Sequence, residues 1–133
     1  MLKEHLKARL AAAGHTLTDF GTDSEASTDY PDYARRVAAA VATSEAERGL
    51  LVCGTGVGMA MTANRRQGVR AVAANDLFTV RLSRTHNDAN VLALGSRIVA
   101  PALAEALLEL FLSTDFEGGR HQRRVTKMDG AGA

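Results

Sequence analysis

The chain has 133 residues, of which 46% are apolar and 23% are charged, a composition typical of one globular domain. A net charge of +1 and the absence of Trp argue against nucleic acid as a partner and against a membrane surface bound through charge. The sequence shows neither an apolar stretch of membrane-spanning length nor a secretory signal, so we expect a cytoplasmic protein. A single cysteine, Cys53, excludes an internal disulfide and suits a reducing compartment.

The first third of the chain predicts two helices with a short strand between them. Leucines at helical spacing indicate a helix that starts at Leu2 and ends at Gly14. Residues 15–20 alternate between polar and apolar types, which predicts a strand. Pro31 suits the first turn of a second helix, which should run through Val41. This order is unusual, because related α/β folds begin with a strand in the middle of the sheet.

The rest of the chain alternates apolar strands with helices. We expect strands at 49–53, 69–73 and 90–94, helices over 59–66, after Asp76 and from Pro101, and a basic, partly helical tail over 115–127. The alternation predicts an α/β fold, a three-layer α/β/α sandwich with a parallel, Rossmann-like sheet, as one domain over residues 1–133. The loops that follow the three strands should meet along one edge of that sheet.

Three glycines at alternate positions follow the strand that ends at Cys53. Gly54, Gly56 and Gly58 allow successive amides to converge on an anion, next to the positive end of a helix. A dinucleotide fingerprint needs glycine where Met59 stands, and a P-loop needs Gly-Lys-Ser/Thr, so both common nucleotide signatures are absent. A tight turn with glycines for packing explains the same residues.

Cys53 points toward this loop, whose amides and helix should favour the thiolate. A thiolate there could move a proton between two adjacent sugar carbons, while the loop amides and Thr55 stabilise an enediolate oxygen. An inert core thiol fits the position of Cys53 equally well.

Two further polar clusters lie downstream. Residues 84–90 concentrate hydrogen-bonding side chains between a helix and a strand, and His86 could shuttle a proton to open a sugar ring. Turn residues and caps explain part of this cluster. In the tail, Arg120 and Arg124 lie one helical turn apart and could address one phosphate together with Arg97. A solvated basic face is the alternative.

Together these motifs resemble those of the ribose-5-phosphate isomerase type B family, which also includes galactose-6-phosphate and allose-6-phosphate isomerases. The resemblance rests on the runs CGTGVGMAMTAN, GVRAV, RTHNDANVLALGSR and EGGRHQRRV, and on TDYPDYA around Tyr30. They cover almost the whole chain in the family's order and spacing. The resemblance implies a sheet that has five strands in the family, the first of which is missing in this chain, and an isomerase of the pentose phosphate pathway. It would interconvert ribose 5-phosphate and ribulose 5-phosphate by ring opening and enediolate proton transfer.

The resemblance also implies roles for individual residues. Cys53 would be the base, Thr55 would assist it, and His86 would open the furanose ring. Cys53 places the chain in the cysteine-dependent branch, since other relatives use a glutamate further along the loop. Family members need neither a metal nor an organic cofactor, and they form homodimers or tetramers whose active sites draw residues from both subunits. The residues expected to bind the phosphosugar are Tyr30, Gly54, Gly56, Val57, Gly58, Asn87, Arg97, Arg120 and Arg124.

The beginning of the chain departs from the family pattern. Family chains start with a strand and an Asp-His-Ala-Gly-type turn before the helix that here begins near Leu2. That turn supplies an Asp and a His to the substrate site. Either the first residue is an internal position of a longer protein, which we expect, or the chain exists as given and has lost function. Two alternatives stay open: an isomerase of a six-carbon phosphosugar (allose or galactose 6-phosphate), and a phosphosugar-binding subunit without turnover.

Overall fold

The computed structural model describes residues 2–21 and 29–130. Helices and strands follow one another as the sequence predicts, with one exception described below. In chain order they are α1 (Leu2–Ala12), α2 (Tyr30–Ala42), β1 (Gly49–Cys53), α3 (Val57–Ala63), β2 (Ala71–Ala73), α4 (Leu77–Thr85), β3 (Val91–Gly95), α5 (Pro101–Ser113) and α6 (Arg120–Met128).

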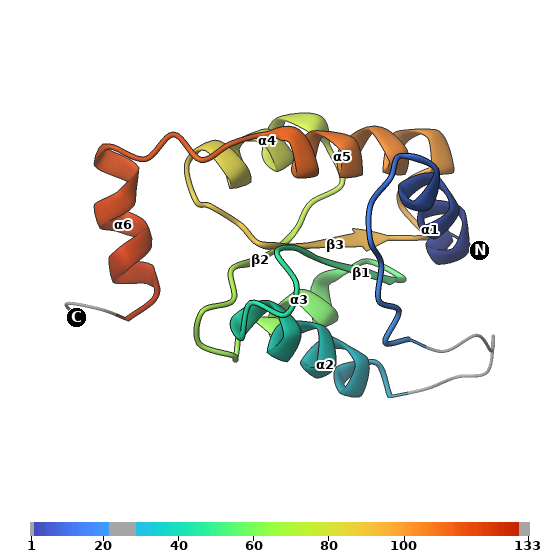
Figure 1. Cartoon of the computed structure of the whole chain (residues 1–133), viewed down its shortest axis with the longest axis horizontal. Helices are drawn as coiled ribbons and strands as arrows, with labels where there is room; N and C mark the ends of the chain where they lie inside the picture. The colour runs from blue at the N-terminus through green and yellow to red at the C-terminus, as the bar shows by residue number, and fades with distance from the viewer. Residues whose placement is uncertain (1, 22–28, 131–133) are drawn as a thin grey trace.

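The three strands form a parallel sheet in the order β1-β3-β2 (Figure 1). Cys53 lies opposite Gly95 in the first pair, and Ala73 lies opposite Ala93 in the second. The central strand β3 is buried at every residue, which explains its continuous apolar run. The parallel register also confirms that the loops after the three strands leave from one edge, the carboxyl edge of the sheet.

Helices cover both faces of the sheet, as expected of a three-layer sandwich. Figure 1 shows α1, α4 and α5 above the strands and α2 and α3 below them. Successive side chains of a strand point to opposite faces. Leu92 and Leu94 therefore enter one core, which includes Phe111, while Val91 and Ala93 enter the other.

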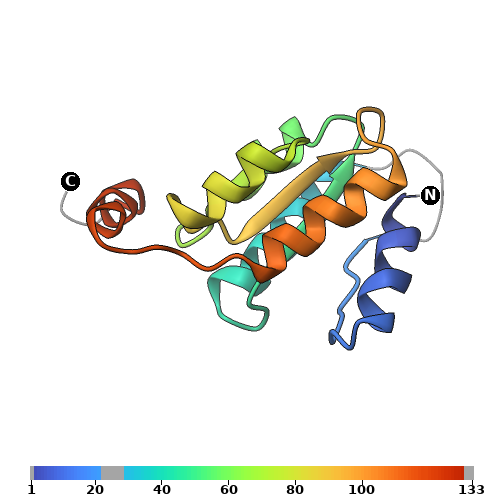
Figure 2. The same ribbon diagram turned by 90° about the horizontal axis from the view of Figure 1, so that it is seen from above.

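The strand predicted over residues 15–20 is wrong, because this segment has no regular secondary structure. A strand is stable only when its backbone groups pair with a neighbour, and among the described residues β1 pairs only with β3. The segment instead runs back along α1 (Figure 2), where Asp19 accepts hydrogen bonds from Lys7 at 2.8 Å and Lys3 at 3.1 Å. The alternation of polar and apolar residues predicted a strand, but in the part of the chain that the structure describes the segment has no neighbouring strand to pair with.

Element boundaries follow local capping. The helix predicted over 59–66 begins earlier, at Val57, because Gly56 adopts a left-handed φ of 84° and ends the loop. Asp76 caps α4 as predicted, accepting a hydrogen bond from the Thr79 amide at 2.8 Å. In the described ranges, every helix is too short or too polar to cross a membrane.

Candidate functional site

The residues predicted to act on a phosphosugar fall into two groups at opposite edges of the sheet. Cys53 ends β1 at the carboxyl edge. Helix α4 starts beyond that edge and runs back, so His86, which follows α4, lies at the amino edge where β3 begins. The five residues of β3 separate the edges by about 13 Å. Figure 1 shows the β3 arrow pointing away from α6.

The thiol loop, residues 53–58, is shaped by its backbone. Cys53 is half-buried, and the amide of Gly56 donates to its Sγ at 3.2 Å. A Cβ on Gly56 would lie 3.0 Å from the carbonyl oxygen of Ala93, so the loop packs directly on β3. Thr55 is exposed, and its hydroxyl accepts from the Val57 amide at 3.3 Å. The loop therefore presents a thiol with a backbone donor on its sulfur.

Arg97 and Tyr30 both lie against this loop. The amide of Arg97 donates to the Gly54 carbonyl at 3.1 Å, and a Cβ on Gly54 would meet the Arg97 Nε at 3.5 Å. A Cβ on Gly58 would collide with the Tyr30 ring, 2.7 Å from its Cζ. The fold thus brings a guanidinium and a phenol to the carboxyl edge, together with Cys53 and the glycine amides.

At the amino edge, Arg84 is part of the framework. Its side chain is 3% exposed and donates to the carbonyl oxygens of Thr114 and Ala89 at 3.0 and 2.6 Å. It also donates to Asp88 Oδ1 at 2.8 Å. These bonds join the end of α4, the turn before β3 and the segment after α5. Part of the polar run at 84–90 is therefore structural, and Arg84 fixes the turn that carries His86.

A stacked histidine pair occupies the amino edge. The rings of His86 and His121 lie 4.2 Å apart with planes 14° from parallel. The Nε2 of His121, which is buried, is 3.5 Å from Glu117 Oε1, and the Glu117 amide donates to the Thr85 carbonyl at 3.1 Å. Desolvation lowers the pKa of His121, and the charges of His86 and Arg120 lower this pKa further. The neutral imidazole of His121 is therefore favoured at pH 7.

His121 and Glu117 join His86 in the amino-edge group, and neither was among the residues that the sequence predicted to act on a phosphosugar. Both residues stand in the run EGGRHQRRV, but Glu117 precedes α6, so the spacing of residues on a helix face does not predict their contact. Helix α6 is also fixed at its far end, where the Asp129 carboxylate accepts a bond of 2.9 Å from Arg70. Arg120 and Arg124 are exposed on α6 near His121. The predicted phosphate ligands are thus divided, with Arg97 at the opposite edge.

Asn87 follows His86 and lines a hollow in the surface. It is exposed and helps to line a depression of 660 Å³, together with residues from β2 and the end of α6. Asn87 therefore belongs with His86 to the amino-edge group.

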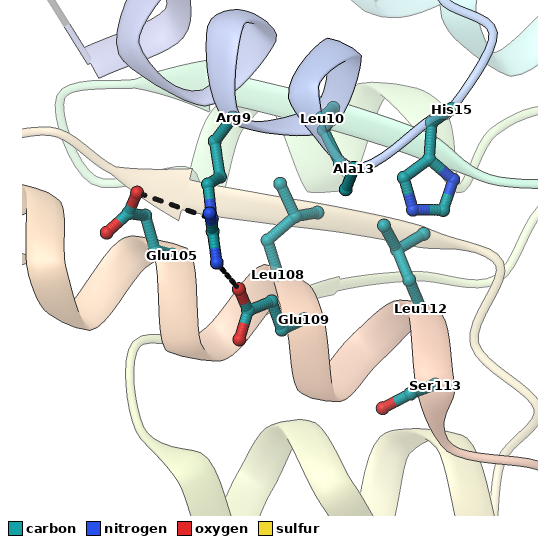
Figure 3. Close-up of a pocket in the computed structure, with 9 residues that line it drawn as sticks. All are labelled: Arg9, Leu10, Ala13, His15, Glu105, Leu108, Glu109, Leu112 and Ser113. Carbon is teal, nitrogen blue, oxygen red and sulfur yellow. Dashed lines mark hydrogen bonds and ion pairs between the residues drawn. The ribbon is translucent and has the colours of Figure 1, made fainter.

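A separate hollow of 440 Å³ lies between α1 and α5 (Figure 3). Its lining includes Leu108 and Leu112, and Arg9 spans one side by pairing with Glu109 at 2.8 Å and Glu105 at 3.7 Å. Residues predicted to bind the phosphosugar are absent from its lining. This hollow is a gap in helix packing, away from both groups.

The arrangement defines the class of protein first. A parallel sheet with helices on both faces, and a glycine loop at the carboxyl edge, is the architecture of an α/β enzyme that works at its strand ends. The sequence profile described as Ribose/Galactose Isomerase matches residues 1–128, and the chain belongs to this family. It is therefore an isomerase.

Individual relatives agree with the family. Ribose-5-phosphate isomerase B of Escherichia coli is 48% identical over 125 residues, which are 94% of this chain and 84% of the relative. The structure of the Clostridium thermocellum ribose-5-phosphate isomerase B superposes with a TM-score of 0.95 at 43% identity, covering 97% of this chain and 87% of that one. The Mycoplasma genitalium enzyme with bound ribulose 5-phosphate has a TM-score of 0.92 at 40% identity, covering 97% and 86%.

Proposed function

We propose that this chain interconverts ribose 5-phosphate and ribulose 5-phosphate, with Cys53 as the base. The observation that carries the proposal is the 3.2 Å hydrogen bond from the Gly56 amide to Cys53 Sγ. This bond directs a backbone N–H of the glycine loop at the sulfur, and the thiolate is the form of cysteine that can accept a proton from carbon. The names of the E. coli and M. genitalium relatives support the five-carbon substrate.

In the proposed mechanism His86 opens the furanose ring by moving a proton between the anomeric hydroxyl and the ring oxygen. The Cys53 thiolate then removes the proton from C2 of the open-chain aldose, leaving an enediolate. The thiol returns that proton to C1 while the O2 proton passes to O1, which yields the ketose. Loop amides and Thr55 stabilise the charge on the enediolate oxygen.

The remaining residues hold the substrate. Tyr30 lines the sugar site, and Asn87 binds a sugar hydroxyl. The phosphate is bound through charge-assisted hydrogen bonds from Arg97, Arg120 and Arg124.

Because one chain keeps Cys53 and His86 at opposite edges, we propose that the active form is a homodimer, or a tetramer of such dimers. His86 and α6 of one copy would then face the thiol loop of the other. A two-fold contact of this kind completes two identical sites at once. Large apolar side chains exposed on or near the carboxyl edge support such a contact; they are Val57, Met61, Leu77, Phe78 and Ile98. A catalytic free thiol also favours a reducing compartment, the cytoplasm.

The test of the base is the variant Cys53→Ala, assayed for ribulose 5-phosphate formation by absorbance. We expect turnover to fall by about 10²–10⁴-fold, the usual contribution of a positioned base, with an unchanged circular dichroism spectrum. Because Cys53 is the only cysteine, alkylation by iodoacetamide modifies this thiol alone, and ribose 5-phosphate should slow the inactivation. Full activity of Cys53→Ala would remove Cys53 from the mechanism.

A second assay separates the alternatives on substrate. Ribose 5-phosphate should be the preferred substrate in competition with allose 6-phosphate and galactose 6-phosphate. Preference for a six-carbon sugar would keep the mechanism and change the substrate. Thermal stabilisation by phosphosugars without turnover of any of them would instead indicate a binding subunit.

A further inference from the structure

Two imidazoles and one carboxylate converge at the amino edge. Across residues 2–21 and 29–130, the side chains that could together hold a metal ion are His86, Glu117 and His121, whose ligand atoms all lie within 4.8 Å of one another. We propose that this triad binds a divalent ion of the zinc class, and that the ion inhibits the enzyme by withdrawing His86 from the reaction. The inhibition, but not the binding, rests on the proposed function.

Two of the three ligands, His121 and Glu117, are already at metal-binding spacing. Nitrogen and oxygen ligands sit about 2.0–2.2 Å from Zn²⁺, so neighbouring ligands of a tetrahedral ion are about 3.4 Å apart. The Nε2 of His121 and the Oε1 of Glu117 are 3.5 Å apart. Glu117 lies just before α6 and His121 lies in its first turn, and the bond from the Glu117 amide to the Thr85 carbonyl holds Glu117 beside the end of α4.

The third ligand has to turn. The lone pair of an imidazole nitrogen lies in the plane of its ring, so two rings stacked at 14° cannot both direct a nitrogen at one ion. His86 is half-buried, and its ligand nitrogen already lies within 4.8 Å of the ligand atoms of His121 and Glu117, so metal binding requires a rotation of its ring out of the stack. The stacked and metal-bound positions of His86 are therefore mutually exclusive, which is why the ion would act as an inhibitor.

The donor set selects the kind of ion. Two imidazole nitrogens and one carboxylate suit Zn²⁺, Ni²⁺ or Co²⁺, whereas Mg²⁺ and Ca²⁺ prefer oxygen ligands alone. Glu117 supplies one negative charge, and Arg120 and Arg124, on the helix of His121, oppose the ion. Three protein ligands leave a fourth position for water. We therefore expect an exchangeable site rather than a structural one.

Isothermal titration calorimetry with ZnCl₂ tests the binding. The titrated chain should carry Cys53→Ser, because a thiolate is itself a strong zinc ligand. We expect one ion per chain, with Mg²⁺ unable to compete. Glu117→Gln and His121→Gln should each weaken binding by about 10–100-fold or more, since even the loss of an outer-shell partner costs that much.

His5→Gln is the matched control. His5 forms the comparable pair with Glu105, at 3.4 Å on an exposed surface, but it lies outside the three-ligand cluster. Its removal should leave zinc affinity unchanged. Unchanged affinity in Glu117→Gln, or no binding to the Cys53→Ser chain, would overturn the proposal. Glu117 is exposed, so Glu117→Gln decides the question even if His121→Gln fails to fold.

The inhibitory half needs an activity readout. Zinc should slow ribose 5-phosphate turnover in the unmodified chain, EDTA should restore it, and Glu117→Gln should reduce the inhibition at a given zinc concentration. Equal inhibition of Glu117→Gln and the unmodified chain would place the inhibitory zinc elsewhere. Calorimetry needs no turnover, so an inactive chain would contradict the proposed function and leave the binding result readable.

Discussion

The two edges of the sheet carry candidate site residues by different means. At the carboxyl edge the main chain shapes the candidate site, because the backbone of Gly56 packs directly on β3 and its amide donates to Cys53 Sγ. At the amino edge side chains form it, because the buried guanidinium of Arg84 and the His86–His121 stack join separate segments. The first arrangement depends on the absence of side chains, and the second depends on a few particular ones. Added side chains should therefore disturb the carboxyl edge, whereas the loss of particular side chains should disturb the amino edge.

The largest expected effect tests whether the two edges cooperate across subunits. Cys53→Ala and His86→Gln chains should each lose about 10²–10⁴-fold of their activity. In the proposed homodimer, co-expression with two different affinity tags should give a mixed dimer in which one site has both residues intact. Purified through both tags, this dimer should recover about half of the unmodified activity.

The control for this experiment is the same double-tag purification with two Cys53→Ala chains, which should remain inactive. If Cys53 and His86 acted within one chain, every site of the mixed dimer would lack one of them. If the mixed dimer were no more active than the separate variants, the proposal that the two edges cooperate across subunits would be wrong.

The framework of the amino edge should be the more fragile of the two in stability. Arg84→Met removes three hydrogen bonds and leaves the buried Ala89 carbonyl oxygen and the partly buried Thr114 carbonyl oxygen without this donor. We expect a loss of about 3 kcal/mol in the free energy of unfolding, measured by urea denaturation. Arg81→Met changes an exposed arginine on the same helix and should cost less than about 0.5 kcal/mol. Equal losses in the two variants would contradict the framework role.

The sequence predicted the strands well where burial alone decides. The strand predicted at 49–53 matches β1 at both ends, because a short, wholly apolar run is typical of a buried parallel strand. The cap at Asp76 and the start at Pro101 also held, because both depend on local chemistry. By contrast, residues 15–20 needed a neighbouring strand, and alternation carries no information about a neighbour.

The sequence indicated which residues belong to the candidate site better than it indicated how they are arranged in the fold. Cys53 and His86 were singled out from the residues and the family resemblance together. Their separation followed from topology, since a helix that starts at the carboxyl edge must end near the amino edge. The His86–His121 stack joins α6 to α4 across 35 residues, and its contact depends on Arg84 and on the Glu117–Thr85 bond. Neither bond has a sequence signature.

At the carboxyl edge, a single methyl group should disturb the thiol loop. The Cβ of Gly58→Ala would collide with the Tyr30 ring, so either the ring or the loop must move. We expect a loss of about 1–3 kcal/mol in stability, measured by thermal unfolding, together with reduced turnover. The double variant Gly58→Ala/Tyr30→Ala removes the collision and should regain stability relative to Gly58→Ala. Failure to regain it would mean that the collision with the Tyr30 ring is not the cause of the loss in Gly58→Ala.

The smallest expected effect concerns the segment at 15–20. Among the described residues this segment has no hydrogen-bonded strand partner, and it is held by the ion pairs of Asp19. Burial raises the pKa of Asp19, but bonds from Lys7, the Gly21 amide and Lys3 outweigh it and lower this pKa to about 2. A carboxyl group whose folded pKa lies below its ordinary 3.8 stabilises the fold above that pH and loses the contribution as pH falls toward 2. Because Asp19 is partly exposed, we expect Asp19→Asn to cost only about 1 kcal/mol at neutral pH.

The discriminating measurement for Asp19 is the pH dependence of urea unfolding. Between pH 4 and pH 2 the unmodified chain should lose stability more steeply than Asp19→Asn, and the two curves should converge at the acid end. Asp32→Asn is the control, since Asp32 pairs with Arg35 at 3.6 Å on an exposed surface of α2. The stability of Asp32→Asn should stay within about 0.5 kcal/mol of that of the unmodified chain across this pH range. Parallel curves for the unmodified and Asp19→Asn chains would show that the segment is held by something other than this carboxylate.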